Sequence, residues 1–154
     1  MVTAKRVPDY LIDTNVLVYA LDGSRPHERA RAVAWLDYLI ATGAGALSTQ
    51  ALTEVARVCL GRLTPRWHPD DALEHVQSLA RAFYVFPVTP AIVAEALRGV
   101  SRHKLSFFDA QMWAVARLNQ IPALLTQDMA SGAEMDGVLM VDPFATDVPP
   151  APPG

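Results

Sequence analysis

The sequence predicts an α/β fold, a three-layer α/β/α sandwich around a central, mostly parallel sheet of about five short strands. Short apolar runs that predict strands alternate along the chain with amphipathic segments that predict helices. Because helices follow the strands in this way, we expect a parallel sheet that is covered on both faces. The 154 residues, 51% of them hydrophobic, fit a single domain with one packed core.

The first predicted strand is residues 10–12, which are apolar and end at Asp13. Asp13 and its polar neighbours predict a turn that can cap a short helix over residues 16–21. The predicted elements that follow are a helix at 27–41, a strand at 46–48, a helix at 50–63 capped by Thr49, a helix at 70–82, a strand at 84–88, a helix at 90–100, a helix at 107–119 capped by Ser106, and strands at 123–126 and 138–141. The proline inside the 84–88 run predicts an edge strand.

Residues 1–146 are expected to form the single domain, and the proline-rich tail 147–154 is expected to be disordered. No segment has the roughly 18 consecutive apolar residues that span a bilayer, and acidic and polar residues interrupt any signal-peptide core. The one cysteine, Cys59, excludes an intrachain disulfide and fits a reducing compartment. We therefore expect a soluble, cytoplasmic protein without a membrane partner.

The net charge of −3 argues against bulk electrostatic binding of nucleic acid. The basic residues are nevertheless suited to phosphate, because all but two of the thirteen are arginines, whose forked guanidinium matches phosphate oxygens. The basic residues therefore suit local contacts to a phosphodiester backbone.

Four acidic side chains fall where the carboxyl ends of parallel strands form a reactive crevice. Asp13 follows the first strand, Asp128 follows the strand at 123–126, and Glu54 and Asp109 lie in the first turns of two helices. Each position also has an ordinary explanation: a helix cap for Asp13, an ion pair with Arg57 for Glu54, a favourable helix start for Asp109, and a turn for Asp128. Their coincidence at strand ends and helix starts favours a shared site.

Four carboxylates in one pocket repel one another unless a cation neutralises them. No histidine or cysteine is an immediate neighbour of these acids, so an all-oxygen site is the simplest hypothesis. Oxygen ligands favour Mg²⁺, or Mn²⁺, over zinc. Such a site suits phosphodiester hydrolysis.

Five ordered blocks of the sequence resemble those of PIN domains. They are LIDTNVL at 11–17, LSTQ at 47–50 followed by TE at 53–54, LSFFDA at 105–110, LLTQDM at 124–129 and VDPF at 141–144. The length and the SFFDA block look most like VapC-type toxins of bacterial toxin–antitoxin pairs.

The resemblance implies a PIN-like fold and a Mg²⁺-dependent endoribonuclease that forms a homodimer and is inhibited by a small antitoxin protein. It assigns metal binding to the positions of Asp13 and Asp109, with Glu54 and Asp128 completing the pocket. Thr14, Asn15 and Thr126 would be supporting polar residues. The proline-rich tail lies outside the resemblance.

Two other functions compete with the nuclease. An aspartyl-nucleophile phosphatase or phosphotransfer domain fits poorly, because Asn15 occupies the place of the second aspartate of the haloacid-dehalogenase pattern, and the 84–88 strand offers no phosphorylatable aspartate. A PIN-like module that binds RNA or protein without cleaving it remains the alternative. Metal-dependent stabilisation would separate it from the nuclease.

Overall fold

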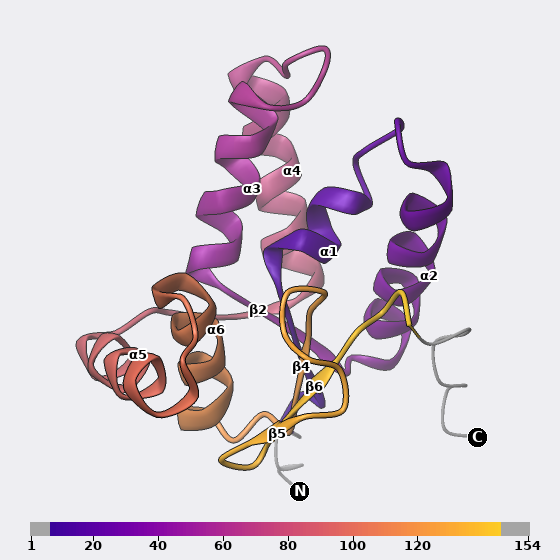
Figure 1. Cartoon of the computed structure of the whole chain (residues 1–154). Coiled ribbons are helices and arrows are strands. Elements are labelled where there is room, and N and C mark those ends of the chain that lie inside the picture. The colour runs from indigo at the N-terminus through magenta and orange to yellow at the C-terminus, as the bar shows by residue number, and fades with distance from the viewer. Residues whose placement is uncertain (1–6, 146–154) are drawn as a thin grey trace, which may run out of the picture.

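A computed structural model describes residues 7–145, which form a sheet with helices on both sides (Figure 1). The strands are β1 (Tyr10–Ile12), β2 (Gly45–Ser48), β3 (Tyr84–Phe86), β4 (Ala123–Leu125), β5 (Glu134–Met135) and β6 (Val138–Val141). The helices are α1 (Thr14–Tyr19), α2 (Pro26–Thr42), α3 (Thr49–Gly61), α4 (Pro69–Ala82), α5 (Pro90–His103) and α6 (Phe107–Leu118). The predicted tail, 147–154, lies outside the described residues.

The α/β class and the mostly parallel sheet are confirmed. The strand order is β3-β2-β1-β4-β6-β5, and every neighbouring pair is parallel except β5 and β6. Figure 1 shows α5 and α6 on one side of the strands and α2 on the other, as a three-layer sandwich requires.

The sheet has six strands rather than about five, because β5 and β6 form a short antiparallel hairpin. Its turn is Asp136-Gly137, and both residues have positive φ, 49° and 86°. An Asp-Gly pair is the preferred sequence for a two-residue hairpin turn of this kind. The signal was therefore present in the sequence, but β5 has only two residues and no apolar run to mark it.

Two local predictions differ in detail. β3 lies at the edge of the sheet as expected, but it ends at Phe86, before the proline. The cap of α3 is Ser48 rather than Thr49: the Ser48 Oγ accepts the Ala51 N–H at 3.2 Å. The Thr49 hydroxyl instead accepts the Val88 N–H at 3.1 Å. Thr49 therefore ties the start of α3 to the segment that follows β3.

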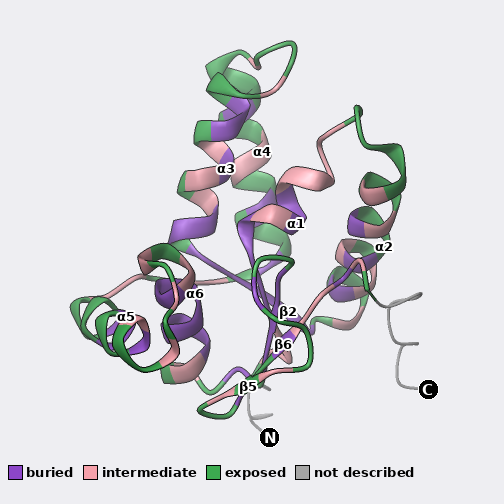
Figure 2. Ribbon diagram, in the orientation of Figure 1, coloured by how far each residue is buried: buried purple, intermediate pink, exposed green. Residues whose placement is uncertain are grey.

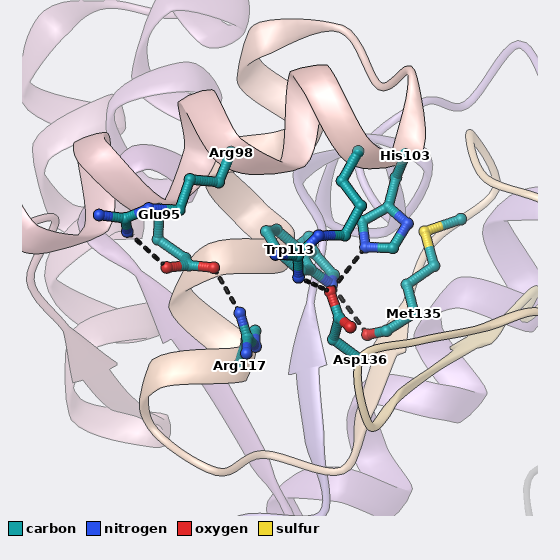
Figure 3. Close-up of polar contacts among 8 residues, drawn as sticks. Glu95, Arg98, His103, Trp113, Arg117, Met135 and Asp136 are labelled. Atoms are coloured by element: carbon teal, nitrogen blue, oxygen red, sulfur yellow. Dashed lines mark hydrogen bonds and ion pairs between the residues drawn. The ribbon is translucent and has the colours of Figure 1, made fainter.

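The helix pair α5–α6 packs unusually closely around a glycine. Gly99 of α5 faces Trp113 of α6, which is fully buried and donates its indole N–H to the Met135 carbonyl at 3.0 Å (Figure 3). Figure 2 shows α6 as largely buried, while the outer face of α5 is exposed. The indole thus connects α5, α6 and the β5–β6 hairpin.

Charged groups brace the same layer. The buried Glu95 of α5 accepts hydrogen bonds from Arg98, at 2.8 Å, and from Arg117 of α6 (Figure 3). Asp136 in the hairpin turn lies 2.8 Å from both Arg102 and His103 at the end of α5. These contacts hold α6, whose first turn carries Asp109, against the sheet.

Among the helices of residues 7–145, none combines the length and the apolar character that crossing a bilayer requires.

We predict that Gly99→Ala destabilises the protein. An added Cβ would lie 2.7 and 2.8 Å from two carbons of the Trp113 ring, which is buried and cannot move away freely. We expect the free energy of unfolding, measured by urea denaturation, to fall by about 1–3 kcal/mol. Gly61→Ala is the control, because a Cβ there meets open space; it should leave stability unchanged or raise it by up to about 1 kcal/mol. Equal effects of the two variants would contradict this packing.

Candidate active site

Asp13 is held at the junction of β1 and α1 by hydrogen bonds to both carboxylate oxygens. As the N-cap of α1, it accepts the Thr14 N–H on Oδ1 at 2.7 Å. The Thr126 hydroxyl donates to Oδ2 at 2.6 Å. Each oxygen keeps a further lone pair, so the orientation is fixed while the carboxylate remains able to bind a cation.

Thr126 also positions Asp128. The Thr126 hydroxyl oxygen accepts the Asp128 N–H at 3.1 Å, and Thr126 is fully buried directly after β4. One side chain therefore connects the acid after β1 with the acid after β4. The supporting role expected for Thr126 has a geometric basis in these two hydrogen bonds.

Asp109 completes a cluster of three aspartates. It lies in the first turn of α6 and is half-buried. Carboxylate oxygens of Asp13, Asp109 and Asp128 all lie within 4.8 Å of one another. Three sequence-predicted acids from three separate parts of the chain are thus brought together.

Glu54 stands apart from this cluster. It lines the same cavity as the three aspartates but does not belong to the group within 4.8 Å. Its Oε1 accepts a hydrogen bond from Gln50 Nε2 at 2.9 Å, one helical turn earlier on α3. Its partner is therefore Gln50, and the ion pair with Arg57 does not form among the described residues. Of the four predicted acids, three therefore form one close cluster, and Glu54 lines the cavity outside it.

Two glutamines that the sequence analysis did not select hold this arrangement. Gln50 Nε2 also donates to the Phe108 carbonyl at 3.2 Å, and Gln50 Oε1 accepts from Gln111 Nε2 at 2.8 Å. Both glutamines are buried. The signal for Gln50 was its i,i+4 spacing from Glu54, a distance at which amides and carboxylates meet on a helix. Gln111 offered only its polarity within the apolar α6 sequence.

Thr14 and Asn15 bring unsatisfied polar atoms to the cavity. The Thr14 hydroxyl oxygen and both polar atoms of the Asn15 side chain are buried without a hydrogen-bond partner, and both residues line the cavity. Buried polar groups are normally paired, and one left unpaired costs about 1–3 kcal/mol. Water or a hydrated ion in the cavity would satisfy these atoms.

Burial and mutual repulsion shift the titration of the aspartates. Burial, reinforced by the charges of Asp128 and Asp109, raises the pKa of Asp13 to about 6, although the hydrogen bonds from Thr126 and Thr14 act in the opposite direction. Burial also raises the pKa of Asp109, helped by the charges of Asp128 and Glu54 and opposed by a hydrogen bond from Ser106. Both shifts disfavour the ionised carboxylates, and a bound cation would reverse them.

The cavity has a volume of about 370 Å³ and combines acids with arginines. Arg25, Arg57 and Arg62 line it together with the acids, and all three are exposed. A site of this kind can hold a cation on its carboxylates and an anion on its guanidinium groups. A phosphodiester accompanied by a divalent ion has both characters.

The sequence matches the model of a known protein family. The PIN domain family model matches residues 10–130, and the chain belongs to the PIN domain family. The resemblance found in the sequence is confirmed. No curated protein sequence matches the chain.

Solved structures share the fold. A chain of a toxin–antitoxin complex from Klebsiella pneumoniae is 23% identical, with 87% of this chain and 97% of that chain covered and a TM-score of 0.62. A chain of the DNA-bound VapBC structure from Salmonella typhimurium is 15% identical, with 88% of this chain and 98% of that chain covered and a TM-score of 0.62. VapC20 of Mycobacterium tuberculosis, described as a sarcin–ricin loop cleaving toxin, gives 20% identity, 77% and 89% coverage and a TM-score of 0.58. At these identities the likeness establishes the fold.

We predict that the metal-free protein loses stability as the pH rises through the folded pKa of Asp13. The folded pKa, about 6, exceeds the ordinary 3.8, so folding binds a proton between these values. The resulting stability is fully present below pH 3.8 and is lost as the pH rises from that value through about 6. Its size is at most about 3 kcal/mol.

The measurement is urea denaturation in chelator at several pH values. Asp13→Asn should remove this pH-dependent term, whereas Asp37→Asn, on the exposed face of α2, should retain it. An unchanged pH dependence in Asp13→Asn would refute the assignment.

Proposed function

We propose that the chain is a metal-dependent endoribonuclease that hydrolyses RNA phosphodiester bonds. The observation that carries the proposal is the convergence of Asp13, Asp109 and Asp128 within 4.8 Å in a cavity lined by arginines. Membership of the PIN domain family supports it. Mg²⁺ is the proposed cofactor, with Mn²⁺ as an alternative.

The residues present fit a hard divalent cation. Within residues 7–145, the group able to hold an ion consists of three carboxylates and contains no histidine or cysteine. Oxygen ligands favour Mg²⁺ or Mn²⁺, and the unpaired polar atoms of Thr14 and Asn15 suit the water that Mg²⁺ retains. When bound, such an ion supplies positive charge to a phosphate oxygen and increases the acidity of water.

Each residue of the site has a separate role in this proposal. Asp13, Asp109 and Asp128 hold the cation, and Thr126 fixes the first and last of these. Glu54 completes the pocket from α3. In this position its carboxylate can accept a proton from attacking water. Arg25, Arg57 and Arg62 bind and orient the phosphate backbone.

We further propose that the chain is the toxin of a type II toxin–antitoxin pair. Its fold is that of chains in toxin–antitoxin and VapBC complexes, and nearly the whole of those chains is covered, 97% and 98%. A small antitoxin protein would inhibit the nuclease, the active form would be a homodimer, and the protein would act in the cytoplasm. The second candidate, a non-cleaving PIN-like module, would lack the metal response described next.

We predict that Mg²⁺ or Mn²⁺ raises the melting temperature. An ion that binds only the folded protein stabilises it by about 2.7 kcal/mol at 100 times its Kd, which corresponds to about 5–10 °C for a chain of this length. Asp13→Asn or Asp109→Asn should remove most of the rise, because each deletes a charged ligand. Asp37→Asn should keep it. A metal response that survives in both site variants would exclude this centre, and no response in the wild type would favour the binding module.

We predict that the purified protein cleaves total RNA and that chelator stops the cleavage. Asp109→Asn should lower the rate by at least about 100-fold, since even residues behind metal ligands cost 10- to 100-fold when changed. Mapping of the new RNA ends measures the activity and locates the cleavage site.

Expression in bacteria without an antitoxin gives an independent measurement. Wild-type protein should arrest growth, whereas Asp109→Asn should not. Equal growth of both strains would contradict the toxin assignment, and RNA cleavage that persists in chelator would contradict the metal mechanism.

A further inference from the structure

Phe108 is a large aromatic side chain left in solvent beside the acidic pocket. It is 61% exposed, the highest value among the large hydrophobic side chains of the described residues, and it immediately precedes Asp109. It lines the cavity of the acids and also a second hollow of about 390 Å³. An aromatic ring exposed at the border of two hollows offers a flat apolar face to a ligand that enters either of them.

The backbone of Phe108 is fixed by a hydrogen bond, and its exposed ring contacts the ring of a neighbour that packs on the core. The Phe108 carbonyl accepts a hydrogen bond from the Gln50 side chain at 3.2 Å, and Gln50 in turn accepts a hydrogen bond from Gln111. The ring meets that of Phe107 edge to face, with centroids 5.4 Å apart, and Phe107 packs against the core. A ring anchored in this way loses little freedom when a ligand stacks on it, which favours binding.

The second hollow suits a ligand with flat apolar faces and polar edges. Its lining includes the apolar Phe108 and Val88. It also includes Thr49, Thr53 and Gln111, whose side-chain polar groups each make one hydrogen bond within the protein and keep capacity for another. It shares Gln50, Glu54 and Arg57 with the acidic cavity, so the two hollows are adjacent. A nucleobase has this combination of faces and edges, and Arg57 can meet the phosphate attached to it.

We infer that Phe108 and the second hollow form a nucleobase-binding subsite for single-stranded RNA, an inference that rests on the proposed ribonuclease function. Unpaired bases of RNA stack on aromatic side chains, whereas bases within a duplex are not available. A base stacked on Phe108 lies next to Asp109, so its phosphate or the neighbouring one reaches the acids. The subsite therefore selects unpaired RNA and positions it for cleavage.

A protein segment is the other class of molecule that covers exposed aromatic rings. The exposed Arg57 and the continuity of this hollow with the acidic cavity favour a nucleotide, because a base seated here has its phosphate beside both a guanidinium group and the acids. The variants below separate the two.

The test measures RNA affinity in a cleavage-inactive Asp13→Asn background in the presence of Mg²⁺. The probe is a short single-stranded RNA of mixed sequence that contains 2-aminopurine, whose fluorescence reports stacking. Phe108→Ala should weaken binding by about 5- to 150-fold and abolish the stacking signal. Phe108→Trp should retain both, whereas Phe108→Leu, which keeps apolar volume without a flat ring, should resemble Phe108→Ala. Leu97→Ala is the matched control, because Leu97 is 57% exposed on α5 and lines neither hollow.

In the active protein, Phe108→Ala and Phe108→Leu should raise KM for this RNA, whereas Phe108→Trp and Leu97→Ala should not. All four substitutions should leave the metal-induced rise in melting temperature unchanged. Equal RNA affinity with and without the Phe108→Ala substitution, with wild-type cleavage intact, would overturn the subsite and leave the ribonuclease standing. Full binding by Phe108→Leu would contradict stacking and assign the ring to a general apolar contact, as with a protein. A wild type that neither cleaves nor binds RNA would overturn both proposals.

Discussion

The parallel pairing of β1 with β4 is the constraint on which the acidic pocket depends. The two strands are more than 100 residues apart in the chain, yet Tyr10 is paired with Ala123 and Ile12 with Leu125. The Asp13 N–H continues the ladder by donating to the Leu125 carbonyl at 2.9 Å. Thr126, the next residue, then meets the Asp13 carboxylate. A slip of one residue would turn Thr126 to the opposite face of the sheet and would break the link between Asp13 and Asp128.

This pairing places the carboxylate of Asp13 where water solvates it poorly. Asp13 is 6% exposed and lies beside two further aspartates, so burial and repulsion both oppose its ionisation. The layer behind it resists that repulsion: Trp113, Glu95 and their partners hold α6, and therefore Asp109, against the sheet. A cluster of carboxylates that is held in place in this way, with Asp13 buried at its base, is prepared for a cation.

Much of the fold and most of the site could be predicted from the sequence, because their signals are local. The apolar run before Asp13 and the placement of the acids after strands or at helix starts are visible in a few residues each. The close approach at Gly99 could not be predicted, since it depends on which residue of α6 faces it. The separation of Glu54 from the aspartates has the same origin. The sequence predicts that Glu54 lies in the first turns of α3, but how far its side chain extends, and its hydrogen bond with Gln50, depend on packing. Membership of the PIN domain family was readable because its blocks are ordered along the chain.

The central claim is that Asp13, Asp109 and Asp128 together bind a divalent ion, and crystallography with Mn²⁺ tests it directly. Mn²⁺ replaces Mg²⁺ at oxygen sites and scatters anomalously, so its position can be located without reference to the protein atoms. The account predicts one strong anomalous peak between the three carboxylates, with oxygens at about 2.0–2.2 Å. Carboxylates that point in separate directions, with no peak between them in a fully soaked crystal, would contradict it.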